Sequence, residues 1–231
     1  MANPHWTIAF DADDTLWHNE RGFQLTQARF AEMLSDVASP QDLGARLLAA
    51  EKRNLAVYGF GVKGFVLSMI ETALELTDGK VSTSVIGELM AMGRAMLAEP
   101  VELLDGVRDA IEAVKHDADI LLITKGDLLD QDRKLAQSGL GDLFDRVEIV
   151  SDKTPDIYTH IFAAHDTAHH MMVGNSIRSD VIPAICAGAW GVHVPHALTW
   201  AYEVAEAPVE HRRFRRISSL SDLPALVENL S

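Results

Sequence analysis

The chain has 231 residues, of which 48% are hydrophobic, and its formal net charge is −14. This composition is typical of a soluble globular protein and not of a disordered chain. The excess of acidic residues argues against a general nucleic-acid-binding protein, which needs a basic surface to displace counterions. No run of about 18 apolar residues is present, so no membrane span is expected.

The single cysteine, Cys186, excludes an internal disulfide framework and suits a reducing cytoplasm. It lies in the apolar run VIPAICAGAW, which predicts a buried thiol with a packing role. The N-terminus lacks a charged segment followed by a long apolar one, so no signal peptide is indicated and a cytoplasmic location is expected. The one basic cluster, HRRFRR at 211–216, is interpreted as a solvated surface patch.

Short apolar strands and amphipathic helices follow one another along the chain. Residues 6–10 (WTIAF) predict a buried strand. Four helices with no strand between them are predicted from about 20 to 98, and the second begins with Ser39 as N-cap and Pro40 at its first position. From about 101 onward helices alternate with strands predicted at 119–124, 146–150, 170–174 and 190–195, and a helix ends the chain.

Short apolar strands that alternate with helices are typical of parallel βαβ units. We therefore predict an α/β protein with a doubly wound, mainly parallel sheet formed by residues 1–17 and 100–231. Residues 18–99 are predicted to form a four-helix subdomain inserted after the first strand.

Polar side chains follow four of the predicted strands, and ligands of open α/β sheets bind outside the carboxyl ends of the strands. Any one set could be a turn or a helix cap, but four sets indicate a common site. Carboxylates, hydroxyls, ammonium groups and Mg²⁺ are the components of phosphoryl transfer through a covalent intermediate. In strand order the sets are Asp11, Asp13 and Thr15; Thr124 and Lys125; Lys153; and Asn175, Ser176 and Asp180.

Over nearly its whole length the sequence resembles the haloacid dehalogenase (HAD) superfamily, which has a Rossmann-like core and an inserted cap. The family's Asp-x-Asp-x-Thr motif is matched by Asp11, Asp13 and Thr15. The Thr or Ser that ends the next core strand is matched by Thr124 in LLITKGD. The Lys that precedes a helix is matched by Lys153 in VSDKTPDIY.

The resemblance implies a role for each matched position. Asp11 would be the nucleophile and a Mg²⁺ ligand, and Asp13 the general acid and base, with its backbone carbonyl on the metal. Asp180 would support the metal. The phosphate and substrate would be held by Thr15, Thr124, Lys125 and Lys153.

The fourth motif departs from the family pattern, because Asn175 in GNSIRSD stands where the family usually has a carboxylate metal ligand. An amide oxygen can still coordinate Mg²⁺, but one negative charge is lost. We expect Asn175 to coordinate with weak apparent affinity for Mg²⁺, and the substitution Asn175→Asp to tighten binding.

The expected protein is a Mg²⁺-dependent phosphatase that hydrolyses a small phosphorylated metabolite through an aspartyl-phosphate. A metal-independent dehalogenase is the first alternative. Asn175 favours it, whereas Asp13 opposes it because a dehalogenase has no leaving oxygen to protonate. Further alternatives are a catalytically weak scaffold that binds a phospho-ligand and a phosphonate-cleaving enzyme that uses Lys63 for a Schiff base.

The glycine-rich segment YGFGVKGF at 58–65 interrupts the predicted cap helices. It makes Tyr58, Phe60 and Lys63 candidates for substrate contact, and a simple helix–helix turn is the alternative. His196 could line the rim of the site, with surface packing as the default. His165 and His169 have a spacing that can hold a transition metal, but they precede a strand at the end away from the predicted site.

Overall fold

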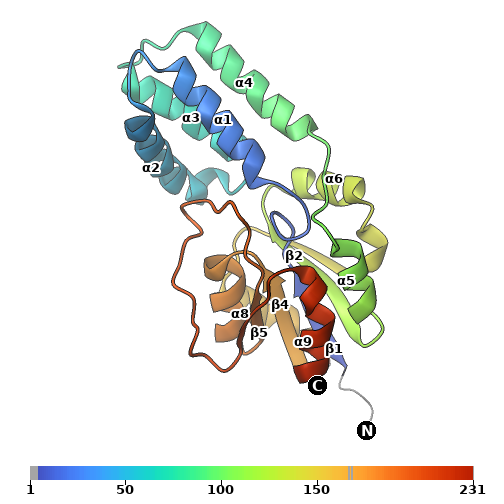
Figure 1. Ribbon diagram of the computed structural model, residues 1–231. Coiled ribbons are helices and arrows are strands. Elements are labelled where there is room, and N and C mark those ends of the chain that lie inside the picture. The colour runs from blue at the N-terminus through green and yellow to red at the C-terminus, as the bar shows by residue number, and fades with distance from the viewer. Residues whose placement is uncertain (1–4, 166, 168, 231) are drawn as a thin grey trace. The chain divides into compact units, whose positions relative to one another are not determined.

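The structure is a computed structural model that describes residues 5–165, 167 and 169–230. The described residues form two compact units, and most of their helices and strands are labelled in Figure 1. The core unit lies within Met1–His18, Val101–Lys125 and Gln131–Ser231, and the helical unit within Asn19–Pro100 and Gly126–Asp130. The predicted division into a core and an inserted cap is retained as a proposal.

A six-stranded, fully parallel sheet forms the centre of the core unit, with strand order β3-β2-β1-β4-β5-β6. This arrangement confirms the predicted α/β class with a doubly wound parallel sheet. The order reverses at β1, so the ends of β1 and β4 flank the crevice where such sheets bind ligands. The strands are β1 (Trp6–Phe10), β2 (Ala118–Lys125), β3 (Arg146–Val150), β4 (His169–Gly174), β5 (Trp190–His193) and β6 (Phe214–Arg216).

Helices cover both faces of the sheet (Figure 1). Successive strand residues point to opposite sides, so both faces carry apolar side chains that the helices bury. Ile8 and Phe10 pack in one cluster with α5 and α9, whereas Ala9 packs in another with α7 and α8. Both faces of β1 are therefore buried, as expected for a central parallel strand. The helices are α5 (Val107–Val114), α6 (Leu128–Ser138), α7 (Pro155–Ala163), α8 (Ile182–Cys186) and α9 (Leu223–Leu230).

Four helices make up most of the helical unit and pack on a core of their own. Ser39 Oγ accepts a hydrogen bond from Asp42 N at 3.2 Å and Pro40 begins α2, which confirms the predicted start of that helix. No helix in the described part of the chain is long and apolar enough to cross a membrane. The helices are α1 (Glu20–Met33), α2 (Pro40–Tyr58), α3 (Val62–Leu76) and α4 (Thr83–Ala98), and their buried apolar residues include Phe30, Leu43, Leu47, Phe65, Met69 and Leu89.

The structure corrects two predictions from sequence. The basic cluster at 211–216 is exposed at His211, Arg212 and Arg216, but its last three residues form an edge strand that was not predicted. This strand, β6, pairs with β5 and buries Phe214 against Ile177 and Val181. Phe214 is one apolar residue among arginines, so the sequence shows no alternation of apolar and polar residues that would predict a strand here. The thiol of Cys186 is exposed and not buried, because it ends the short helix α8 on the outward side of an apolar run.

Candidate active site

Asp11 is buried directly after β1, with a side chain held by its neighbours. Its backbone N–H donates to the carbonyl of Val173 at 2.9 Å, which ties the loop to β4. The Thr15 hydroxyl donates to Asp11 Oδ2 at 2.9 Å and accepts from the Asn175 backbone N–H at 3.0 Å. Thr15 Oγ1 also lies 3.3 Å from Asn175 Oδ1. This one hydroxyl therefore joins the loops that follow β1 and β4.

A tight turn separates the three neighbouring aspartates of the loop. Asp14 has a φ of 60°, in the left-handed region that Asp tolerates better than most residues. Its backbone N–H donates to the Trp17 carbonyl at 2.7 Å, and its Oδ1 lies 3.6 Å from His196 Nδ1. Asp14 is thus a buried turn residue, and His196 lies beside this turn.

The Asp13 carboxylate accepts three hydrogen bonds, from Trp17 Nε1 at 2.7 Å and from Gln131 Nε2 and Lys134 Nζ at 2.9 Å each. Burial by itself would raise the pKa of Asp13. The positive charge of Lys134, and then the three hydrogen bonds, outweigh burial and hold this pKa below its ordinary value. Asp13 is therefore ionised in this conformation. The sequence did not indicate Gln131 or Lys134, which come from α6, more than 110 residues further along the chain.

Lys153 forms a buried bridge between two carboxylates. Its Nζ lies 2.5 Å from Asp11 Oδ1 and 2.7 Å from Asp180 Oδ1. Lys153 precedes α7, whose N-cap Thr154 and first residue Pro155 set the direction of the chain at this point. The structure thus brings together side chains that follow β1, β3 and β4, as the sequence predicted for the edge of the sheet.

The buried charges at this point do not balance, because Asp11 and Asp180 share one ammonium group. Burial, and then the negative charge of Asp180, raise the pKa of Asp11 to about 7, although Lys153 acts in the opposite direction. Burial opposes the charged form of Lys153, but Asp11 and Asp180 together raise its pKa above the usual value. The three side chains carry a net charge of −1 when ionised, so the site favours an additional cation.

Asp180 is fixed by the short segment that follows β4. Its Oδ2 accepts a hydrogen bond from the Ser176 backbone N–H at 2.9 Å, within a single turn of π-helix at Ile177–Val181. A Cβ on Gly174 would lie 2.2 Å from this carboxylate oxygen. Glycine is therefore required at position 174, because only hydrogen leaves room for the Asp180 side chain.

Thr124 and Lys125 end β2, and their side chains lie in different surroundings. Thr124 is 1% exposed and lies one residue before the end of the strand, so its hydroxyl is at the carboxyl edge of the sheet. Lys125 Nζ instead donates to Ser179 Oγ at 2.6 Å and to Glu203 Oε1 at 2.5 Å. The substrate-binding role predicted for both residues stays a prediction.

Glu203 is the centre of a polar network that sequence reasoning missed. Its Oε2 accepts hydrogen bonds from Ser176 Oγ at 2.6 Å and Ser179 Oγ at 2.5 Å, while Lys125 binds its other oxygen. Burial would raise the pKa of Glu203, but the charge of Lys125 and these hydrogen bonds hold it below its ordinary value. The network (Lys125, Ser176, Ser179 and Glu203) connects three residues adjacent to Thr124, Asn175 and Asp180.

Tyr58, Phe60 and Lys63 lie in the helical unit. Tyr58 ends α2 and is 51% exposed, and the turn after it uses Gly59 and Gly61 at positive φ. Lys63 Nζ pairs with Asp127 Oδ2 at 2.8 Å, within the same unit. The part of Tyr58, Phe60 and Lys63 in substrate binding stays a prediction.

The oxygen donors at the candidate site fit a hard divalent cation, with few negative charges among them. Asp11 and Asp180 contribute carboxylates, Asn175 an amide oxygen and Asp13 a backbone carbonyl, which are ligand types that Mg²⁺ accepts together with water. Within residues 5–165, 167 and 169–230, no group of three or more His, Cys, Asp or Glu side chains is arranged to hold a metal ion. His165 and His169 belong to no such group among the described residues. Because only two of the four oxygen donors at the candidate site carry a negative charge, we expect weak binding of Mg²⁺ there.

A doubly wound parallel sheet, whose strand ends gather carboxylates, a threonine and a buried lysine, defines an α/β enzyme with its candidate site at the carboxyl edge. The family model of haloacid dehalogenase-like hydrolases matches residues 7–188. The chain belongs to this family of hydrolases, which confirms the resemblance inferred from the motifs.

Solved structures of the same family share the fold. A haloacid dehalogenase-like family hydrolase from Xanthomonas campestris is 40% identical, with a TM-score of 0.88 over 99% of this chain and 93% of that one. YfnB from Bacillus subtilis, described as a HAD-hydrolase and bound to magnesium, is 17% identical, with a TM-score of 0.65 over 97% and 99%. L-2-haloacid dehalogenase from Xanthobacter autotrophicus is 17% identical, with a TM-score of 0.67 over 97% and 99%. No curated protein shows a significant match to the chain.

Proposed function

We propose that the protein is a Mg²⁺-dependent phosphatase that hydrolyses a small phosphorylated metabolite through an aspartyl-phosphate on Asp11. The observation that supports this most strongly is the second carboxylate, Asp13, on the same loop as Asp11. A reaction that expels an alkoxide needs a proton donor near the leaving oxygen, whereas expulsion of a halide needs none. The hydrogen bonds of Asp13 hold this carboxylate at the site.

In the proposed reaction an oxygen of Asp11 attacks phosphorus and the bond from phosphorus to the ester oxygen breaks. Asp13, after taking up a proton, donates it to the leaving oxygen. Asp13 then removes a proton from water, which attacks phosphorus, releases inorganic phosphate and regenerates Asp11. Thr124 and Lys153 would bind the phosphoryl oxygens as charge is redistributed over them.

Asp11, the Asp13 backbone carbonyl, Asn175 and Asp180 would hold Mg²⁺, which when bound supplies positive charge that neutralises the phosphoryl oxygens. The charge balance favours such a cation. A phosphate dianion would add two negative charges to a group of side chains that already carries −1. Lys153 is already shared between Asp11 and Asp180, so it cannot offset this charge alone.

A metal-independent dehalogenase is the second candidate, and Asn175 is the observation that favours it. The L-2-haloacid dehalogenase that shares the fold shows that this scaffold can carry that activity. A 2-haloacid substrate, which carries one carboxylate, would also add less negative charge at the site than a phosphate dianion. Asp13 has no evident task in that reaction.

Two assays on the purified protein separate these candidates. We expect hydrolysis of para-nitrophenyl phosphate with Mg²⁺, loss of this activity in the Asp11→Asn variant, and no chloride release from 2-chloropropionate in EDTA. Asp14→Asn is the matched control, because it changes a buried aspartate on the same loop at a φ that Asn also tolerates. Chloride release without phosphatase activity would replace the proposal with the second candidate, and activity retained in Asp11→Asn would refute both.

A further inference from the structure

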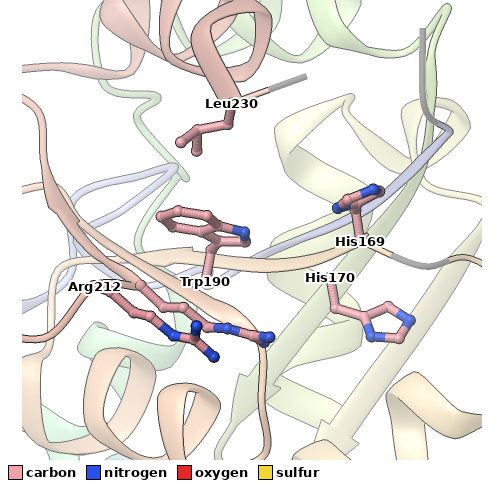
Figure 2. A pocket seen from close by; sticks show the side chains of 6 residues that line it. His169, His170, Trp190, Arg212 and Leu230 are labelled. Carbon is pink, nitrogen blue, oxygen red and sulfur yellow. The ribbon is translucent and has the colours of Figure 1, made fainter.

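A pocket of about 310 Å³ lies at the edge of the sheet where the strands begin (Figure 2). His169 and His170 begin β4, Trp190 begins β5, and two arginines directly precede β6. The candidate active site lies beyond the opposite ends of these strands, about 17 Å away along the five steps of β4, at ~3.3 Å per residue. The residues that line the pocket are His169, His170, Trp190, Arg212, Arg213 and Leu230.

The lining of this pocket combines positive charge with an apolar wall. Arg212 and Arg213 contribute two guanidinium groups, and none of the lining residues that the structure describes has a carboxylate side chain. Figure 2 shows the side chain of Leu230 facing the ring of Trp190, with both histidines to one side. In a chain with a formal net charge of −14, such a lining is unusual and creates a local positive potential.

The positive charge is not neutralised by the rest of the described chain. Among the ion pairs of the residues that the structure describes, none involves Arg212 or Arg213. Arg215 lies over the Trp190 ring at 4.6 Å. His170 Nε2 is buried without a hydrogen-bond partner among the described residues. Buried polar atoms in folded proteins normally have a partner. The groups that an anion in this pocket would meet are the guanidinium groups of Arg212 and Arg213.

We propose that this pocket binds a small organic anion, with a carboxylate or phosphate group on the arginines and a flat apolar portion against Trp190 and Leu230. Guanidinium groups match both kinds of anion through paired hydrogen bonds. Arg215 covers one face of the Trp190 ring, so the uncovered part of the indole and Leu230 together offer the apolar wall for a ring-shaped ligand. Because the site is remote from Asp11, it is a site for a regulatory or second ligand and not part of the substrate pocket.

The test uses three probes with one ring and different head groups: benzoate, phenylphosphonate and the neutral benzyl alcohol. The readout is the NMR signal of the Trp190 indole N–H in the full chain, assigned by its loss in Trp190→Phe. We expect at least one anion to shift this signal in a saturable manner, less strongly at high salt, while benzyl alcohol does not. The anion that binds more tightly identifies the head group.

Arg212→Gln combined with Arg213→Gln should weaken binding of the anion at least about tenfold. Arg94→Gln, at an exposed arginine of the helical unit, should leave it unchanged. Arg212 is exposed, so the single Arg212→Gln variant keeps the test available if the double variant does not fold. Equal shifts with benzyl alcohol, no shift with either anion, or unchanged binding in the arginine variants would refute the proposal.

Discussion

Asn175→Asp should lower the stability of the metal-free protein and raise the stability of the Mg²⁺-bound protein. The substitution places a carboxylate where Asn175 Oδ1 now lies, 3.3 Å from Thr15 Oγ1. The same hydroxyl donates to Asp11 Oδ2 at 2.9 Å. The new carboxylate would therefore join a group of side chains in which Asp11 and Asp180 already share the single charge of Lys153.

The magnitude follows from these distances. Two oxygens that approach one hydroxyl at 2.9 and 3.3 Å are at most about 6 Å apart, and unit charges at that distance repel by about 3 kcal/mol at an effective dielectric constant of about 20. Asn175 is partly exposed, so solvent screening reduces this cost to about 1–2 kcal/mol. With Mg²⁺ the same charge becomes favourable, and apparent affinity should rise about 10–100-fold.

Two measurements on each variant check this reasoning. Thermal unfolding in EDTA should show Asn175→Asp below the wild type, and saturating Mg²⁺ should reverse the order. Mg²⁺ titration of para-nitrophenyl phosphate hydrolysis should give the tighter apparent constant for Asn175→Asp and a weaker one for Asn175→Ala, which has no oxygen to offer. An apparent affinity for Mg²⁺ in Asn175→Asp that is equal to or weaker than that of the wild type would refute the assignment of this position to the metal site.

Three further predictions test other parts of the molecule. Glu203→Gln should lower kcat/KM about 10–100-fold, because the loss of its charge removes the ion pair with Lys125 and shifts the segments that carry Thr124 and Asp180. The exposed Glu206→Gln on the same loop should not, and equal kinetics for the two variants would count against the Glu203 network. Burial, above all, lowers the pKa of His170 in the folded protein, so the unfolded chain takes up the proton first as the pH falls below about 6.5. The wild type should therefore lose unfolding free energy relative to His170→Gln below this pH. Parallel curves of the unfolding free energy in urea against pH would contradict this. Ser39→Ala should cost about 1 kcal/mol of the unfolding free energy in urea by removing the N-cap of α2, and no change would show that this cap bond does not contribute.

Local patterns were sufficient for most of the fold. The strand at 6–10, the helices from 20 to 98 and the alternation after 101 follow from the spacing of apolar residues, which the two faces of a parallel sheet and the inner sides of helices impose. The edge strand β6 was not predicted, because Phe214 is its only well-buried residue and the other two are arginines. Its pairing with β5 depends on a neighbour more than 20 residues earlier in the chain.

The motifs likewise predicted which side chains gather at the candidate site, because the carboxyl ends of parallel strands meet at one edge. Asp11, Lys153 and Asp180 lie together as expected. No motif or spacing in the sequence predicted the partners of Asp13 or the Glu203 network as part of the site. Gln131, Lys134 and Glu203 are ordinary surface residue types, and only the folded arrangement gives them buried partners.

The sequence by itself determined the order of the helices and of every strand except β6. It also determined the residues at the ends of those strands, the missing carboxylate at Asn175 and the membership in a hydrolase family. These features depend on the local chain and on spacing, which the sequence states directly. Only the tertiary structure decided how the charges pair: that Asp11 and Asp180 share Lys153, that Lys134 holds Asp13 ionised and that Lys125 turns to Glu203. Pairing depends on distances between segments far apart in the chain, and burial sets its strength, so neither can be deduced before the sheet is assembled.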